Sequence, residues 1–132
     1  MGLGEEQLCP AQVICIVDDD ESVRVGLSSL LRSFDYEVVG FESGIQLLAW
    51  IRNNRCSCII SDVQMPGMSG IEMFLHMVRE DLLIPTIFIT AYPTPELQQK
   101  ALSHGACAFL IKPVAAKDLE ALIGLYAEPR TD

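Results

Sequence analysis

The sequence predicts an α/β domain in which a five-stranded parallel sheet is covered by helices on both faces. Short, almost continuously apolar runs alternate with amphipathic helical patterns, the connections between them are short, and no linker or internal repeat interrupts this order. Continuous apolar runs of this length are typical of strands buried on both faces. Regular alternation of strand and helix favours a parallel sheet with helical crossovers.

The composition narrows the class of protein. A chain of 132 residues has room for one domain with one core, and half of its residues are hydrophobic and a fifth charged, which excludes general disorder. The formal net charge is −9. Such an acidic surface repels phosphate backbones, so we expect no nucleic-acid contact by this domain and expect cationic partners, including divalent metals.

The chain ends and the cysteines predict a cytoplasmic location. We expect residues 1–11 to form a flexible polar leader, because they lack the charged and apolar regions of a signal peptide. Residues 128–132 are expected to be a tail, the start of a linker to an absent output domain. No apolar run approaches the roughly 20 residues that cross a membrane. Five cysteines without a signal peptide favour free, packed thiols in a reducing cytosol.

The first two strand–helix units occupy residues 13–51. The run Val13–Val17 predicts a buried strand, and Asp20 is placed to cap the helix that follows. That helix is indicated by apolar residues on one face: Val23, Leu27, Leu30, Leu31 and Phe34. Residues 37–41 predict the second strand, and Ser43-x-x-Gln46 has the form of a capping box at the next helix.

The last three units follow the same plan. Strands are predicted at residues 58–62, 86–90 and 107–111. The helices between them begin at a second capping box, Ser69-x-x-Glu72, and at Thr94-Pro95, an N-cap followed by proline at the first helical position. The last helix runs to Tyr126, and residues 114–116 offer it no good N-cap, so we expect it to start late.

Polar residues stand at the carboxyl ends of four predicted strands. The first strand ends in Asp18 and Asp19, the third in Asp62, the fourth in Thr90 and the fifth in Lys112. In a parallel sheet these ends share one edge, so the side chains should converge. Three carboxylates there would repel one another unless a cation compensated, and hard oxygen ligands suit Mg²⁺.

This set of groups suits the transfer of a phosphoryl group to a carboxylate. It supplies an oxygen nucleophile, ligands for a metal that neutralises developing charge, and a cation and a hydroxyl that can hold phosphoryl oxygens. Each residue alone could be a helix cap, a strand residue or a solvated charge. Their joint occurrence at four strand ends favours a functional site.

The residues resemble a known family at this point. The acidic pair in Val17-Asp18-Asp19-Asp20, the loop of residues 62–70, Thr90-Ala91 and Lys112-Pro113 resemble the motifs of response-regulator receiver domains of bacterial two-component signalling. The resemblance covers residues 12–127 and implies the flavodoxin-like, doubly wound (βα)5 fold. Within the family, the chain is most similar to FixJ-like regulators of the LuxR type.

The resemblance implies a role for each residue of the site. Asp62 would be the phosphoacceptor for a sensor histidine kinase, and Lys112 would pair with the phosphoryl group. Mg²⁺ would be bound by Asp19 as the main acidic ligand, by Asp18 directly or through water, by Asp62 and by the backbone carbonyl of Gln64. The Lys112–Pro113 bond is often cis in this family.

The resemblance also implies a switch. Thr90 would move toward the phosphoryl group while Phe109 turns inward, and Ala91 would keep the approach to Asp62 open. Gln64 and Tyr92 would control access to the acyl phosphate and its lifetime. The switched surface would be formed by the fourth helix, fifth strand and fifth helix, and would control a phosphorylation-dependent homodimer or a transcriptional output domain.

Other functions remain open from the sequence. A small aspartyl-phosphate phosphatase of the haloacid dehalogenase type could use Asp18 and Asp20 as its Asp-x-Asp motif, although Asp62 would then have no role. A receiver that acts as an unphosphorylated adaptor is a second alternative. A nucleotide-binding Rossmann domain is disfavoured because no Gly-x-Gly-x-x-Gly follows the first strand. We expect a signalling phosphoacceptor and not an enzyme.

Overall fold

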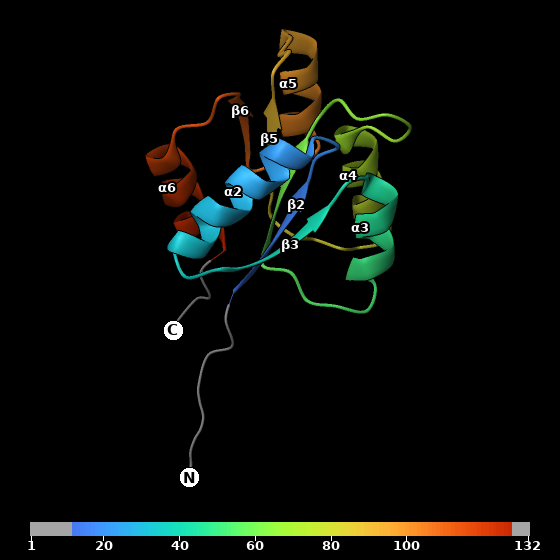
Figure 1. Ribbon diagram of the computed structural model, residues 1–132. Helices are drawn as coiled ribbons and strands as arrows, with labels where there is room; N and C mark the ends of the chain where they lie inside the picture. The colour runs from blue at the N-terminus through green and yellow to red at the C-terminus, as the bar shows by residue number, and fades with distance from the viewer. Residues whose placement is uncertain (1–11, 128–132) are drawn as a thin grey trace.

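The computed structural model describes residues 12–127, within which strands and helices alternate (Figure 1). The predicted leader (1–11) and tail (128–132) lie outside the described residues. The elements are, in order, β2 (Val13–Val17), α2 (Glu21–Ser33), β3 (Glu37–Phe41), α3 (Gly44–Ile51), β4 (Cys58–Asp62), α4 (Gly70–Arg79), β5 (Thr86–Thr90), α5 (Pro95–Ser103), β6 (Ala108–Ile111) and α6 (Ala116–Tyr126).

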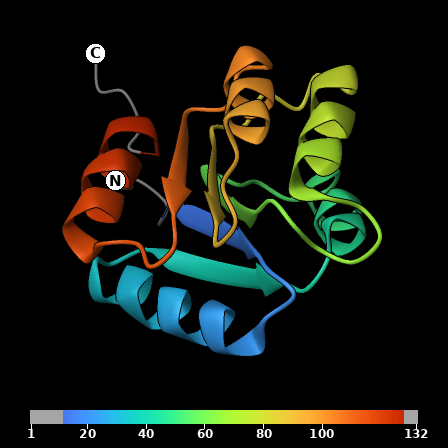
Figure 2. The same ribbon diagram turned by 90° about the horizontal axis from the view of Figure 1, so that it is seen from above.

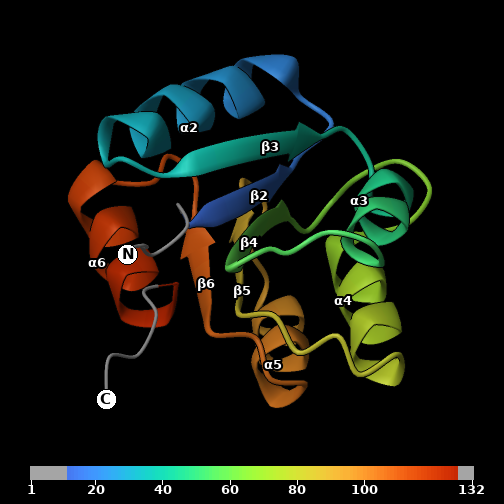
Figure 3. The ribbon, with the colours of Figure 1, turned by 90° about the horizontal axis from the view of Figure 1, so that it is seen from below.

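The five strands form one parallel sheet in the order β3-β2-β4-β5-β6. Helices α2 and α6 cover one face, and α3, α4 and α5 cover the other (Figures 2 and 3). The predicted fold class, a doubly wound (βα)5 domain with helices on both faces, is therefore confirmed. No helix within residues 12–127 is long and apolar enough to span a membrane.

The core lies on both sides of the sheet because the central strands are apolar on both faces. Along β2, Ile14 and Ile16 pack toward α2 and α6, whereas Cys15 and Val17 pack toward α3 and α4. All four side chains are fully buried. A strand buried on both faces reads as a continuous apolar run, which is why the strands were predictable.

Most of the predicted helix starts are confirmed. The Asp20 carboxylate accepts the Ser22 N–H, and Thr94 caps the helix that begins at Pro95. Ser69 and Glu72 form the reciprocal capping box. The expected lack of a good N-cap for the last helix is also confirmed, because α6 begins at Ala116 and its N-cap, Ala115, makes no side-chain hydrogen bond.

Two local predictions need correction. Ser43 caps α3 as expected, but the Gln46 side chain accepts the N–H of Glu42 instead of returning to Ser43, so the capping box is incomplete. The last strand begins at Ala108 and not at Cys107, whose N–H still bonds to the carbonyl of Thr86. Neither difference moves a residue of the predicted site.

The cysteines in the described part of the chain are free thiols that pack in or near the core. Cys15 and Cys58 are buried, and Cys56 and Cys107 are partly buried. Cys56 packs against the cluster beneath α3 and α4, and Cys107 against the opposite one. The prediction of free, packed thiols is confirmed for these four, and Cys9 lies outside the described residues.

The connection from β4 to α4 is fixed by a close approach at Gly70. The Gly70 N–H donates to the carbonyl of Val63 at 2.9 Å. A Cβ atom at Gly70 would lie 2.1 Å from the carbonyl oxygen of Asp62 and 2.9 Å from Oγ of Ser61. Only glycine lets the first turn of α4 lie this close to the end of β4, and this packing places Asp62.

Replacing Gly70 by alanine is expected to destabilise the fold by about 1–3 kcal/mol, the usual cost of forcing an extra carbon into a packed site. The matched control is Gly26→Ala in α2, where an added Cβ meets nothing within 4 Å. That control should be neutral or stabilising by up to about 1 kcal/mol, because alanine is the better helix former. Urea denaturation measures both, and equal effects of the two substitutions would contradict this account of Gly70.

Candidate functional site

The carboxyl ends of the four neighbouring strands β2, β4, β5 and β6 meet at one edge of the sheet, as predicted. Asp18 and Asp19 follow β2, Asp62 ends β4, Thr90 ends β5 and Lys112 follows β6. The parallel register sets the ends of β2 and β4, and then of β4 and β5, side by side. Residues separated by as many as 94 positions therefore contact one another.

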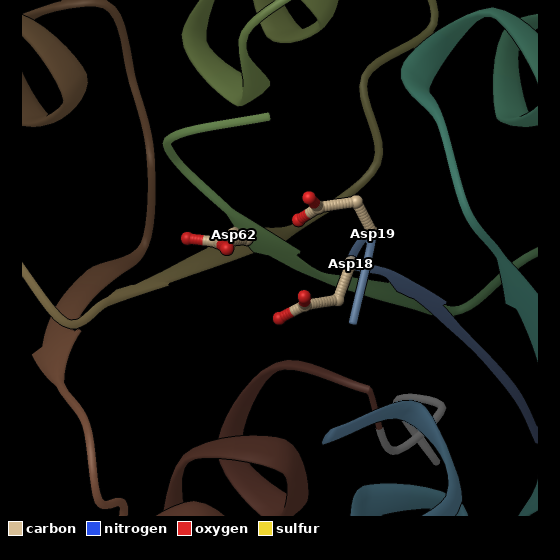
Figure 4. Close-up of side chains that lie close together, drawn as sticks. All are labelled: Asp18, Asp19 and Asp62. Carbon is tan, nitrogen blue, oxygen red and sulfur yellow. The ribbon is translucent and has the colours of Figure 1, made fainter. Parts of the chain in front are cut away.

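Three carboxylates form an acidic cluster at this edge, which we define as Asp18, Asp19 and Asp62 (Figure 4). Each offers an oxygen atom, and these atoms lie within 4.8 Å of one another. Asp18 is completely buried and Asp62 is 7% exposed, whereas Asp19 is open to solvent. Among residues 12–127, this is the group of acidic, histidine or cysteine side chains that could hold a metal ion.

Lys112 joins the two buried carboxylates. Its Nζ lies 2.9 Å from Oδ2 of Asp18 and 3.3 Å from Oδ2 of Asp62. Burial acts to lower the pKa of Lys112, but its hydrogen bonds to these carboxylates and their charges outweigh burial and raise it. Lys112 is therefore a fixed positive charge at neutral pH.

The position of Asp18 is set by its own surroundings. Its Oδ1 accepts the N–H of Asp20 at 2.9 Å, and its backbone carbonyl accepts a hydrogen bond from the Arg24 guanidinium at 2.6 Å. Its N–H donates to the carbonyl of Phe41. A buried carboxylate without partners would be costly, and the Asp20 N–H on Oδ1 and Lys112 on Oδ2 offset that cost for Asp18.

The surroundings of Asp62 disfavour its ionised form. Burial raises its pKa above the ordinary 3.8, the charge of Asp18 raises it further, and Lys112 partly opposes both. A carboxylate whose negative charge is only partly compensated is stabilised by an additional cation, and likewise by a further hydrogen-bond donor. The acidic cluster thus fits a divalent cation with oxygen ligands.

The backbone carbonyl of Gln64 stands two residues after Asp62, on the loop that follows β4. Within residues 12–127, its carbonyl accepts no hydrogen bond. A carbonyl oxygen without a hydrogen bond is a hard ligand of the kind that Mg²⁺ prefers.

Thr90 lies on the other side of the site and is completely buried. Its hydroxyl donates to Oε1 of Gln64 at 2.5 Å and accepts the N–H of Tyr92 at 3.1 Å. The Gln64 Nε2 donates to the carbonyl of Tyr92 at 3.3 Å. We call these residues the Gln64–Thr90–Tyr92 network.

The remaining predicted residues lie near this network or next to Lys112. Ala91 is exposed directly after Thr90. Phe109 lies opposite Phe88 in the β5–β6 register and is partly buried against the cluster under α4 and α5. The Lys112–Pro113 peptide bond is cis, as the resemblance implied.

One contributor to the site was not predicted from the sequence. Arg24, one turn into α2, reaches back to the backbone of Asp18. An arginine six positions after an aspartate is a common pattern, so the sequence offered no specific signal. The alternative Asp18–Asp20 pair is not formed as a site, because the Asp20 carboxylate caps α2.

Comparison with known proteins identifies the family. The family model described as "Response regulator receiver domain" matches residues 14–124. The chain belongs to this receiver-domain family, whose members are signalling domains of two-component response regulators.

Individual relatives agree with this assignment. The receiver domain is 39% identical over 107 residues to "Response regulator protein TmoT" of Ectopseudomonas mendocina, a match that covers 81% of this chain and 49% of TmoT. It is 33% identical over 129 residues to "Nodulation protein W" of Bradyrhizobium diazoefficiens, covering 98% of this chain and 56% of that protein. The chain therefore spans about half the length of these curated relatives.

The structural comparison gives the same result. The crystal structure of "FixJ-N" superposes with a TM-score of 0.84 at 27% identity, covering 94% of this chain and 99% of that chain. This similarity is consistent with the FixJ-like subfamily indicated by the sequence motifs.

Removing the charge of Asp62 is expected to stabilise the metal-free receiver domain at neutral pH. A carboxyl whose pKa is raised by folding weakens the fold at pH values above its folded pKa, and this effect disappears as the pH falls to the ordinary value of 3.8. Asp62→Asn should therefore unfold at a higher urea concentration than wild type at pH 7, with the two converging in acid.

The control for this measurement is Asp35→Asn, which removes an exposed carboxylate outside the acidic cluster, in the turn after α2. It should leave the urea midpoint at pH 7 close to that of wild type. A lower urea midpoint for Asp62→Asn than for wild type at pH 7 would contradict the electrostatic description of the site.

Proposed function

We propose that this receiver domain accepts a phosphoryl group on Asp62 from a phosphohistidine of a sensor kinase, in a reaction that depends on Mg²⁺. The observation that carries this proposal is the grouping of Asp62 with the two other carboxylates of the acidic cluster and with the Lys112 ammonium, which lies 3.3 Å from Oδ2 of Asp62. A nucleophilic oxygen, a cation site and a fixed positive charge at one edge are the parts that phosphoryl transfer to a carboxylate needs.

In the proposed reaction, a carboxylate oxygen of Asp62 attacks the phosphorus atom in line with the histidine nitrogen. The new P–O bond forms as the P–N bond breaks, and the leaving imidazole takes up a proton. Lys112 then pairs with a phosphoryl oxygen in place of the Asp62 oxygen that it contacts now. When bound by Asp18, Asp19, Asp62 and the Gln64 carbonyl, Mg²⁺ supplies neutralisation of the phosphoryl charge.

A groove beside Lys112 supports a helical kinase partner. It has a volume of about 500 Å³ and is lined by apolar residues of α2, including Val23, Leu27 and Leu30, and by Pro113. An amphipathic helix of the kinase fits such a groove and would bring its phosphohistidine to the acidic cluster.

The acyl phosphate would act as a signal by drawing Thr90 toward it. Phosphorylation adds about −1.5 to −2 units of charge. The Thr90 hydroxyl would donate to a phosphoryl oxygen, and Phe109 would fill the space that Thr90 leaves, which changes the surface of α5, β6 and α6. Gln64, Ala91 and Tyr92 would control access of water to the acyl phosphate and hence its lifetime.

The output is proposed to be dimerisation or control of a transcriptional domain. The chain spans about half of its curated relatives, which leaves them room for such a domain. The net charge of −9 argues against DNA contact by the receiver domain itself. The domain would promote only its own phosphorylation and dephosphorylation, and it would do so in the cytoplasm that the free cysteines predict.

Phosphorylation is tested by incubating the domain with acetyl phosphate and Mg²⁺ and measuring its intact mass. We expect the gain of one phosphate in the wild type, and no gain in Asp62→Asn or in the presence of EDTA. Asp19→Asn should slow the reaction by at least about tenfold, because it removes a carboxylate ligand, a loss of the size that metal-site substitutions produce. Phosphate gain by Asp62→Asn would refute the proposed acceptor.

Dimerisation is tested by sizing the phosphorylated domain. Ile111 is 58% exposed at the end of the edge strand β6, in the centre of the proposed switched surface. Ile111→Lys should leave the mass gain unchanged and weaken the phosphorylation-dependent dimer at least about tenfold, as expected when a charge replaces a buried apolar contact. The control Val25→Lys changes an exposed residue of α2 and should leave the dimer intact.

A further inference from the structure

The hydroxyl group of Thr90 is fully engaged on the side facing Gln64. It donates its proton to Oε1 of Gln64 at 2.5 Å and accepts the N–H of Tyr92 at 3.1 Å. A threonine hydroxyl has one proton to donate. In this arrangement that proton is not available for a phosphoryl oxygen on Asp62.

The Gln64 side chain is suited to hold this arrangement. Its carbonyl oxygen accepts from Thr90 while its amide nitrogen donates to the carbonyl of Tyr92 at 3.3 Å. One exposed side chain on the loop after β4 is therefore bonded to both the end of β5 and the loop that follows it. The two bonds also define which end of the carboxamide faces Thr90, because a hydroxyl proton needs an acceptor.

We infer that Gln64 is a positioning residue that holds Thr90 in its unphosphorylated orientation, so that switching requires loss of the Gln64–Thr90 hydrogen bond. This inference rests on the proposed phosphorylation of Asp62. The amide oxygen and the phosphoryl oxygens compete for the same proton. A charged phosphoryl oxygen is the stronger acceptor, so phosphorylation breaks the Gln64–Thr90 hydrogen bond. The strength of that bond determines how far the phosphorylated domain shifts to the switched orientation of Thr90.

This role differs from control of water access. Shielding of the acyl phosphate would depend on the size of the side chain at position 64, whatever residue stands at position 90. The hydrogen-bond role depends on an acceptor at position 64 and on a hydroxyl at position 90. Substitutions that keep size and remove hydrogen-bonding groups separate the two.

The test uses Gln64→Met, which keeps the length of the side chain and removes the amide. Gln64 is exposed, so the core is not altered, and its backbone carbonyl is retained. Beryllium trifluoride with Mg²⁺ serves as the phosphoryl analogue, and its apparent affinity is measured by titration. We expect Gln64→Met to bind it roughly fivefold more tightly than wild type, the ratio that corresponds to one neutral hydrogen bond. The control Gln99→Met changes an exposed glutamine of α5 and should have no effect.

A double-mutant comparison isolates the hydrogen bond. In a Thr90→Val background, Gln64→Met should change the apparent affinity less than twofold, because the competing proton is absent. An equal gain in both backgrounds, or no gain in either, would overturn the inference. Gln64→Glu keeps an acceptor for Thr90 and should not reproduce the gain seen with methionine.

A second measurement does not depend on phosphorylation. In the metal-free, unphosphorylated domain, the Thr90 hydroxyl proton should exchange slowly enough with water to be observed by NMR. It should be lost in Gln64→Met and kept in Gln99→Met, and its persistence in Gln64→Met would overturn the inference. If the wild type fails to bind the analogue at all, the proposed function fails, and this exchange measurement alone decides the role of Gln64.

Discussion

The contact of Lys112 with two buried carboxylates is the interaction on which the rest of the site depends. Asp18 and Asp62 come from adjacent strands and would repel each other in a poorly solvated space. The ammonium group of Lys112, which follows the edge strand β6, lies within 3.3 Å of both carboxylates. Because one positive charge faces two negative ones, the site keeps an excess of negative charge, and that excess attracts a further cation.

The fold delivers this arrangement through the strand order. With β4 between β2 and β5, the ends of three buried strands lie side by side, and β6 adds Lys112 from the edge. Each helix then runs back across a face of the sheet and leaves the carboxyl ends of the strands uncovered (Figure 3). The charged residues of the site therefore pack against apolar strands, and the site is still open to solvent on one side, where Asp19 is exposed.

The sequence predicted the fold and the convergence of the acidic cluster with Lys112 because both follow from residue type and order. Continuous apolar runs located β4 and β5, and parallel geometry required Asp62 and Thr90 to share an edge. The sequence did not predict the bond from Gln64 to Thr90 or from Arg24 to Asp18. These contacts depend on side-chain rotamers and loop geometry, which residue types leave undetermined. The incomplete capping box at Ser43 has the same cause, since the Gln46 side chain accepts the N–H of Glu42 instead.

The end of β6 links the charged site to the surface of the domain. Ile111 and Lys112 are adjacent in sequence, yet Lys112 is bonded to two carboxylates whereas Ile111 is 58% exposed. Ile111 is the last residue of β6 and Lys112 follows it directly, so one peptide unit connects the charged site to the exposed face. A displacement of Lys112 would therefore act directly on the end of β6, alongside the proposed movements of Thr90 and Phe109. Substitutions in the core away from β6 should consequently change the stability of the domain more than its signalling.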